Sequence, residues 1–135
     1  AESSVMAGLD YVLDVQIVEP QISAVVVMSL GGPRPIPSFK DHTLDPKFVL
    51  ATTLGELGVV VVVAAGNGGG DARYMSPAHL PNVVTVCGID QEMTRSTSNY
   101  GNDVDICAPG ARIRSASITN GGDDFSYSIM SGTSF

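Results

Sequence analysis

The sequence predicts an α/β domain with a parallel central sheet and helices on both faces. The first observation is an apolar run at residues 59–65, which is too uniformly apolar for a strand with one face in water. The second is a β-branched run at residues 24–28, and a helical pattern lies between the two. Strand, helix and strand in this order form a parallel unit with a right-handed crossover.

The first half of the chain begins with a helix and a strand. Ser3 or Ser4 can cap a helix over residues 5–15, in which apolar residues recur at helical spacing. The strand at residues 24–28 is followed by a Gly-Gly-Pro sequence that closes it. We expect this strand to be buried on both faces, as is typical of parallel sheets.

A second helix and the central strand follow. The side chain of Asp45 can cap this helix, with a proline in the first helical position, and Gly58 ends it. The central strand at residues 59–65 comes next. Two further short strands are predicted at residues 83–86 and 104–106.

Length and charge exclude several classes of protein. The 135 residues suit about one domain, and a 44% hydrophobic composition is enough to bury a core. Fourteen acidic residues against seven basic ones give a net charge of −7, which disfavours nucleic acid as a partner. The longest apolar run is far shorter than the ~20 residues of a membrane-spanning helix. We therefore expect neither a nucleic-acid nor a membrane partner.

Two loops and the carboxyl end contain the candidate site residues. In parallel sheets ligands bind beyond the carboxyl ends of the strands, so residues 29–32 and 66–68 should be neighbours. Asn67 lies between two glycines, where its amide could donate hydrogen bonds into a cleft or simply form a turn. Residues 131–134, Ser-Gly-Thr-Ser, could hold a reactive hydroxyl or form a polar terminus.

Four motifs taken together resemble the subtilisin-like serine proteases. They are Met-Ser-Leu-Gly-Gly at residues 28–32, Val-Ala-Ala-Gly-Asn at 63–67, Cys-Ala-Pro-Gly at 107–110 and Ser-Gly-Thr-Ser at 131–134. Their order and separation match that family over nearly the whole chain, and the stretches at residues 71–78 and 98–101 most resemble its proteinase K branch.

The resemblance implies a role for each motif. It makes Ser134 the nucleophile of a serine endopeptidase and Asn67 the side-chain donor of its oxyanion hole. It also implies that Ser29, Leu30 and Gly31 pair with the main chain of a polypeptide substrate as an added strand. The segment Ala64-Ala65-Gly66 corresponds to a wall of the specificity pocket, whose small residues should admit large apolar side chains.

The chain also departs from the family. The triad needs an aspartate followed by Ser or Thr and Gly, and a histidine followed by Gly-Thr, but neither motif is present. His42 and His79 are therefore interpreted as loop or surface histidines, and Phe135 stands where the family usually has methionine.

The family's aspartate and histidine motifs lie upstream, so residues 1–135 resemble the carboxyl-proximal part of a catalytic domain. The complete protein is expected to be a secreted or vacuolar monomer. The chain alone is expected to be inactive, and its open sheet edge disfavours independent folding.

Two other functions are alternatives to a serine endopeptidase. A nucleotide-binding module could use the glycines at residues 66–70, but they do not form the G-x-G-x-x-G pattern that opens a helix. A non-catalytic subtilisin-like homologue that binds peptides or partner proteins remains the alternative. The aspartate and histidine motifs of the parent reading frame would distinguish it from an enzyme.

Resemblance to the proteinase K branch also implies a calcium ion and a cis peptide bond. The calcium ligands would be the carbonyls of Pro81 and Val83 and the carboxylate of Asp105, all hard oxygen donors. The cis bond is predicted at Ser76-Pro77, although only ~5% of such bonds are cis.

The calcium assignment also sets the expected positions of the two cysteines. It places residue 83 beside 105, so Cys87 lies close to Cys107 but offset from it. We predict buried free thiols, with a disulfide as the alternative.

Overall fold

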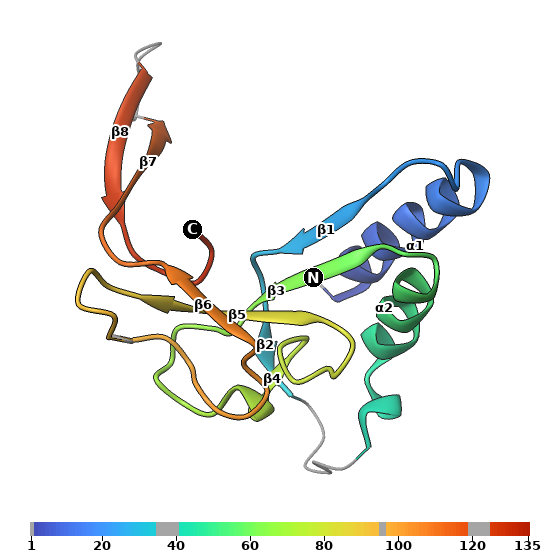
Figure 1. The fold of residues 1–135 in the computed structure, drawn as a ribbon, viewed down its shortest axis with the longest axis horizontal. Coiled ribbons are helices and arrows are strands. Elements are labelled where there is room, and N and C mark those ends of the chain that lie inside the picture. Colours follow the sequence, from blue (N-terminus) through green and yellow to red (C-terminus); the bar gives the residue numbers. More distant parts are fainter. Residues whose placement is uncertain (1, 35–40, 95–96, 119–124) are drawn as a thin grey trace.

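The computed structural model describes residues 2–34, 41–94, 97–118 and 125–135. Its centre is a four-stranded parallel sheet with the order β1-β3-β5-β6 (Figure 1). These strands are Val25–Met28, Val60–Ala64, Val84–Ile89 and Ile106–Pro109. The predicted parallel sheet is confirmed, and the two most apolar runs form neighbouring strands, β1 and β3.

Both predicted helices are present. Helix α1, Glu2–Val18, is longer than predicted and ends just before Glu19-Pro20, because a residue that precedes proline disfavours the helical conformation. Helix α2, Pro46–Glu56, begins as predicted: the Asp45 side chain accepts a hydrogen bond from the Lys47 amide at 3.0 Å. Gly58 follows the helix with a φ of +83°, which a residue with a side chain rarely adopts.

The core lies between the sheet and these helices. Leu9 of α1 and Leu54 of α2 pack with Val61 and Val63 of β3 in one buried cluster. Both helices cover this same face of the sheet, whereas the sequence predicted helices on both faces (Figure 1). Helix α2 connects the parallel neighbours β1 and β3, so a right-handed crossover places it on one face, and α1, which precedes β1, packs beside α2 on that face.

The opposite face of the sheet is exposed in this chain. Val25 and Val27 of β1 are 63% and 70% exposed, and Val60 of β3 is 48% exposed. These valines alternate with the buried residues of the same strands, as the pleat requires. In the part of the chain that the structure describes, no helix is long and apolar enough to cross a membrane.

The predicted strand at residues 104–106 begins later, at Ile106. Val104 closes a turn by donating to the Gly101 carbonyl, and the Asp105 carboxylate accepts from the Thr85 amide at 2.7 Å. Strand β6 therefore begins only after these polar contacts.

The prediction of free thiols is wrong, because Cys87 and Cys107 form a disulfide. The two residues are directly opposite each other in the register of β5 and β6, with Cα atoms 4.4 Å apart. The predicted offset assumed that residue 83 pairs with 105, but Asp105 lies beside Thr85 instead. Cys87 is buried, whereas Cys107 is exposed on the edge strand β6, so the expected burial also holds for only one of them.

Two small antiparallel pairs complete the fold. The short strands β2, Gly32–Pro33, and β4, Met75–Ser76, pair beside the carboxyl end of the sheet, and the Ser76-Pro77 bond is cis as predicted. Strands β7, Ile113–Ile118, and β8, Phe125–Met130, form a hairpin that projects from the body (Figure 1). The sequence predicted no strand here, although Tyr127 and Ile129 alternate with serines in a period-two pattern that is typical of a strand.

Candidate active site

Three segments meet at a cavity of about 260 Å³ beyond the carboxyl ends of β1 and β3. They are the loop after β1, the loop after β3 and the turn that follows β8, and Met75 of β4 adds one wall. The prediction that the first two loops lie next to each other is therefore confirmed. The lining residues are Ser29, Leu30, Gly31, Ala64, Gly66, Asn67, Met75, Thr133 and Ser134.

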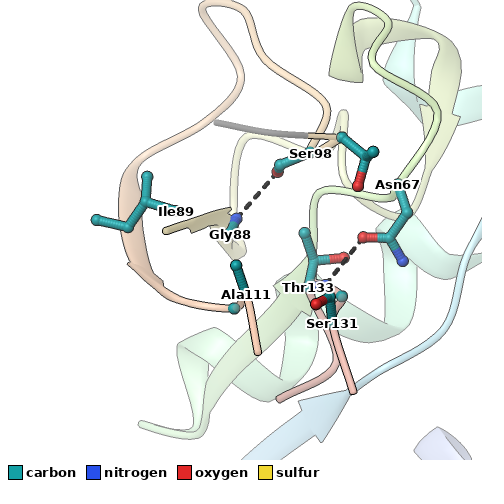
Figure 2. A pocket seen from close by; sticks show the side chains of 10 residues that line it. Asn67, Gly88, Ile89, Ser98, Ala111, Ser131 and Thr133 are labelled. Carbon is teal, nitrogen blue, oxygen red and sulfur yellow. Dashed lines mark hydrogen bonds between the residues drawn. The ribbon is translucent and has the colours of Figure 1, made fainter. Parts of the chain in front are cut away.

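Asn67 is held by the turn that carries Ser134. The Thr133 amide donates to Oδ1 of Asn67 at 2.9 Å (Figure 2). The Gly66 amide donates to the Thr133 hydroxyl at 3.2 Å. Because a backbone N–H can only donate, the carbonyl end of the Asn67 side chain faces Thr133. The NH₂ end is therefore the end left for a ligand.

The space behind Asn67 is packed. The small hollow drawn in Figure 2 has a volume of about 10 Å³, which is room for one water molecule at most. A Cβ on Gly132 would lie 3.4 Å from Nδ2 of Asn67, an ordinary van der Waals contact, so the backbone of this turn lies close to the side chain. The room for a ligand beside Asn67 is therefore in the larger cavity, which Ser134 also lines.

The side chain of Asn99, for which the sequence predicted no role, holds the loop after β3 in place. Its Oδ1 accepts from the amides of Gly68 and Gly70 at 3.0 Å each, and its Nδ2 donates to the Ala65 carbonyl at 2.8 Å. Gly66 has a φ of +99°, and a Cβ there would lie 2.5 Å from Nδ2 of Asn99. The signal was available in the Ser-Asn-Tyr-Gly sequence at residues 98–101.

Ser134 lies against the loop after β1. Its hydroxyl is 3.4 Å from the Ser29 carbonyl, and the Ser29 hydroxyl is 3.4 Å from the Ser134 carbonyl, so both contacts are long. Ala64 lines the cavity, but Ala65 is fully buried behind it and is not in the lining. The structure thus brings together every predicted catalytic and substrate-binding residue except Ala65.

Neither histidine lines this cavity. His42 lies in the short helix η1, His42–Leu44, and its ring stacks on His79 with centroids 5.5 Å apart. His79 is a loop residue, but it is 2% exposed and not at the surface as predicted. Segments that are far apart in the sequence bury it, which no local pattern reveals.

A buried network surrounds His79. Its Nδ1 is 2.9 Å from the Met75 carbonyl, and its Nε2 is 3.8 Å from Oδ2 of Asp45. Burial lowers the pKa of His79 and outweighs the attraction of Asp45. Burial would raise the pKa of Asp45, but hydrogen bonds from Ser76 and Lys47 outweigh it, so the pKa of that carboxyl is lowered.

The three positions implied for calcium lie at the start of β5 and β6. Oδ2 of Asp105 accepts from Thr85 at 2.7 Å, and the side chain is exposed, so its other oxygen can reach a cation. The Thr85 carbonyl accepts from the Asp105 amide and therefore points towards Asp105. Val83 precedes Thr85 by two residues, and alternate residues of an extended chain direct their carbonyls to the same side. The donor set of two carbonyls and a carboxylate fits Ca²⁺, with water completing the shell. Among the described residues, no three acidic, histidine or cysteine side chains form a metal site on their own.

The fold and the cavity together define a class of protein. It is an α/β protein in which a loop after a parallel strand presents an asparagine amide, and the turn after β8 presents a serine hydroxyl, to one cavity. Within that class, the model of the subtilase family, peptidase S8, matches residues 3–135, and the chain belongs to this family.

Similar proteins agree with this assignment. The chain is 54% identical over 78 residues to "Subtilisin-like protease 1" of Pseudogymnoascus destructans, which covers 57% of this chain and 19% of that protein. It is 39% identical over 108 residues to "Subtilisin-like protease 6" of Arthroderma gypseum, covering 79% and 24%. A crystal structure of a cold adapted subtilisin-like serine proteinase superposes with a TM-score of 0.70 at 31% identity, covering 99% of this chain and 43% of that one. The chain thus spans about a fifth to a quarter of the curated relatives' length.

Proposed function

We propose that this chain is part of a serine endopeptidase, called the parent protein below, which cleaves peptide bonds through an acyl-enzyme at Ser134. The observation that supports it most is the bond from the Thr133 amide to Asn67, which leaves the Asn67 NH₂ for a ligand in the cavity that holds Ser134. Family membership points to the same activity.

The proposed reaction uses these groups in order. A base takes the proton of the Ser134 hydroxyl while its oxygen attacks the peptide carbonyl carbon. The carbonyl oxygen becomes an oxyanion, which the NH₂ group of Asn67 stabilises by hydrogen bonding. The base gives the serine proton to the departing amine, which leaves an ester at Ser134. Water, activated by the same base, then hydrolyses the ester, releases the carboxylic acid and restores the serine hydroxyl.

The substrate is proposed to be a polypeptide in extended conformation. Residues 29–31 line the cavity next to Ser134, so a peptide paired with their backbone would present its carbonyl to the hydroxyl. Ala64 and Gly66 form a wall with short or absent side chains, which favours large apolar residues before the scissile bond.

A fluorophosphonate probe tests this proposal at Ser134. The chain contains neither triad motif, and among the described residues neither histidine nor another base lines the cavity that holds the hydroxyl. We expect no labelling of the isolated 135-residue chain and stoichiometric labelling at Ser134 in the parent protein, read by peptide mass mapping.

The control is the parent protein with Ser134→Ala, which should not react. Labelling of the isolated chain would contradict this expectation, because it would mean that a base within the chain reaches the Ser134 hydroxyl. Absence of labelling in the folded parent protein would contradict the endopeptidase and favour a non-catalytic homologue that binds peptides.

We also propose that Ca²⁺ binds at Pro81, Val83 and Asp105 and stabilises the start of β5 and β6. When bound, the ion would take no part in the chemistry and would only join these two segments. Calcium should raise the Tm of the parent protein, and Asp105→Asn should abolish this rise, because an amide supplies a weaker oxygen ligand without charge. An equal rise in both proteins would exclude the site.

We propose that the parent protein is a secreted or vacuolar monomer, and the disulfide supports the proposed compartment. Disulfides persist in oxidising compartments and are rare in the cytosol. Alkylation without reductant, followed by peptide mass mapping, should therefore leave Cys87 and Cys107 unmodified in protein taken from its source.

A further inference from the structure

Asn67, the proposed oxyanion donor, is followed directly by Gly68 in the sequence. An Asn-Gly pair is chemically labile, because the backbone nitrogen of the glycine can attack the asparagine side chain and glycine has no Cβ to hinder the approach. Both residues are exposed, so water reaches them. The candidate active site therefore contains a candidate modification site that its proposed chemistry does not use.

Deamidation of such a pair has two steps. The Gly68 nitrogen loses its proton to a base in solution and bonds to Cγ of Asn67. The bond from Cγ to Nδ2 breaks, the side-chain nitrogen takes a proton back and leaves as ammonia, and a five-membered succinimide ring remains. One water molecule then opens the ring at either carbonyl and gives aspartate or isoaspartate.

The nucleophile of this reaction is held by Asn99. The Gly68 amide donates to Oδ1 of Asn99 at 3.0 Å, and the Gly70 amide donates to the same oxygen at 3.0 Å. While this hydrogen bond is intact, the Gly68 nitrogen keeps its proton and cannot turn towards Cγ of Asn67. The contact with Asn99 therefore opposes the first step.

Asn99 cannot follow a movement of the loop, because it is buried and bonded on its other side. The residue is 2% exposed, and its Nδ2 donates to the Ala65 carbonyl at 2.8 Å. Its backbone amide donates to the Gly66 carbonyl at 2.8 Å. These bonds also fix the orientation of the side-chain amide, since only its oxygen can accept from Gly68.

The group that would be attacked is held by a different segment. Oδ1 of Asn67 accepts from the Thr133 amide at 2.9 Å, and in Figure 2 the Asn67 side chain points to that turn. The turn is itself anchored, because the Gly132 amide donates to the Gly110 carbonyl at 2.7 Å. The two reacting groups of the pair are thus bound to separate parts of the fold, and both bonds must open before they can meet.

We propose that Asn67-Gly68 is a latent deamidation site and that Asn99 is the positioning residue that keeps it intact. When the bond from Gly68 to Asn99 opens, Asn67 is converted to aspartate or isoaspartate. The product places a carboxylate where the oxyanion requires a donor, so the modification inactivates the parent protein. This loss of activity rests on the proposed function, whereas the modification and its control by Asn99 do not.

Peptide mass mapping of the parent protein carrying Ser134→Ala, which prevents self-digestion, tests the site directly. Folded and urea-unfolded samples are incubated at mildly alkaline pH in water enriched in ¹⁸O, which should enter the new carboxyl group at residue 67. Modification of Asn67 should be about 30-fold slower in the folded protein, because two hydrogen bonds of ordinary net strength must open. Equal rates in the folded and unfolded samples would overturn the proposal.

The sequence offers an internal reference for the unfolded sample. A second Asn-Gly pair, Asn120-Gly121, lies outside the described residues. In urea both pairs should react at similar rates, because neither is then held by the fold. A much slower reaction at Asn67 in urea would show that local sequence, and not Asn99, protects the pair.

Two substitutions separate protection by Asn99 from a general effect on folding. Asn99→Ala removes the acceptor of the Gly68 amide and should speed modification of folded Asn67 by about fivefold or more, the equivalent of one hydrogen bond. Gly68→Ala keeps the N–H but places a methyl group beside the nucleophile, where a Cβ would lie 3.4 Å from Oδ1 of Asn99. The double variant loses the same acceptor as Asn99→Ala, yet its Asn67 should react slowly. A double variant that reacts as fast as Asn99→Ala would exclude attack by the nitrogen of residue 68.

Hydrogen exchange of the wild-type backbone gives a measure that does not depend on whether Asn99→Ala folds. The opening that exposes the Gly68 amide to solvent also frees its nitrogen for attack. The Gly68 amide should therefore be protected from exchange in the folded protein. If it exchanged as fast as in the unfolded chain while Asn67 stayed intact, Asn99 would not be the protecting residue.

The active parent protein provides the functional readout. With incubation time, kcat per full-length molecule should fall in proportion to the modified fraction of Asn67, with KM nearly unchanged. Gly68→Ala should lose its own starting activity more slowly than the wild type. If Asn67 were modified without loss of kcat, its oxyanion role and the proposed reaction would fail and the modification site would stand. If kcat fell equally fast in Gly68→Ala, inactivation through this site would be excluded.

Discussion

Replacing Asn67 by alanine in the parent protein is expected to lower kcat for peptide hydrolysis by about 10²- to 10³-fold, with KM nearly unchanged. This is the loss found when such a donor is removed from a protease of this family. The physical reason is that the NH₂ of Asn67 meets negative charge only as the carbonyl oxygen becomes an oxyanion. Steady-state kinetics with a chromogenic peptide separate the two constants.

A second substitution distinguishes this role from a structural one. Asn67 also accepts the Thr133 amide through Oδ1, so alanine removes an anchor of the turn as well as a donor. Asn67→Asp keeps the acceptor and replaces the donor with a negatively charged oxygen. It should lose at least as much turnover as alanine. If Asn67→Asp retained most of the activity, or if the loss appeared only in KM, the oxyanion role would be excluded.

Removing the disulfide should have the largest effect on stability. The double variant Cys87→Ala, Cys107→Ser should lower the free energy of unfolding of the parent protein by about 3 kcal/mol. The bridged residues are 20 positions apart, and opening this loop restores conformational entropy to the unfolded chain. Urea unfolding without reductant measures the difference.

Reductant provides the control for that experiment. It should destabilise the wild type to a similar extent and leave the double variant unaffected. Equal stability of the two proteins without reductant would mean that the bridge contributes nothing to the fold, and free thiols in the unreduced wild type would exclude the bridge itself.

Local patterns predicted the elements that depend on local interactions. The Asp45 cap and the glycine stop bound α2 as expected, because capping and positive φ are properties of a few neighbouring residues. The predicted central strand forms β3, and alternate residues of β3 are buried. By contrast, β8 alternates aromatic and β-branched residues with serine, a strand pattern that the sequence analysis overlooked, and β8 pairs with β7 along its whole length.

The candidate site was predicted in part. The loops of Ser29 and Asn67 follow parallel strands, so their proximity could be expected from topology alone. Their contact with Ser134, which lies 105 residues after Ser29, depends on how the turn after β8 returns to the sheet. The support of the site by Asn99 is likewise a matter of long-range packing, because its partners lie about 30 residues away.

The sequence by itself determined the class of fold, both helices, the strands β1, β3 and β5, and the motifs that bring Ser134 and Asn67 into one family. Only the tertiary structure decided the register of β5 against β6, and with it the disulfide between Cys87 and Cys107. It also decided the burial of His79 beside Asp45. The physical reason is the same in both cases: register and burial follow from the packing of segments distant in the chain, whereas caps, turns and apolar periodicity are set by neighbouring residues.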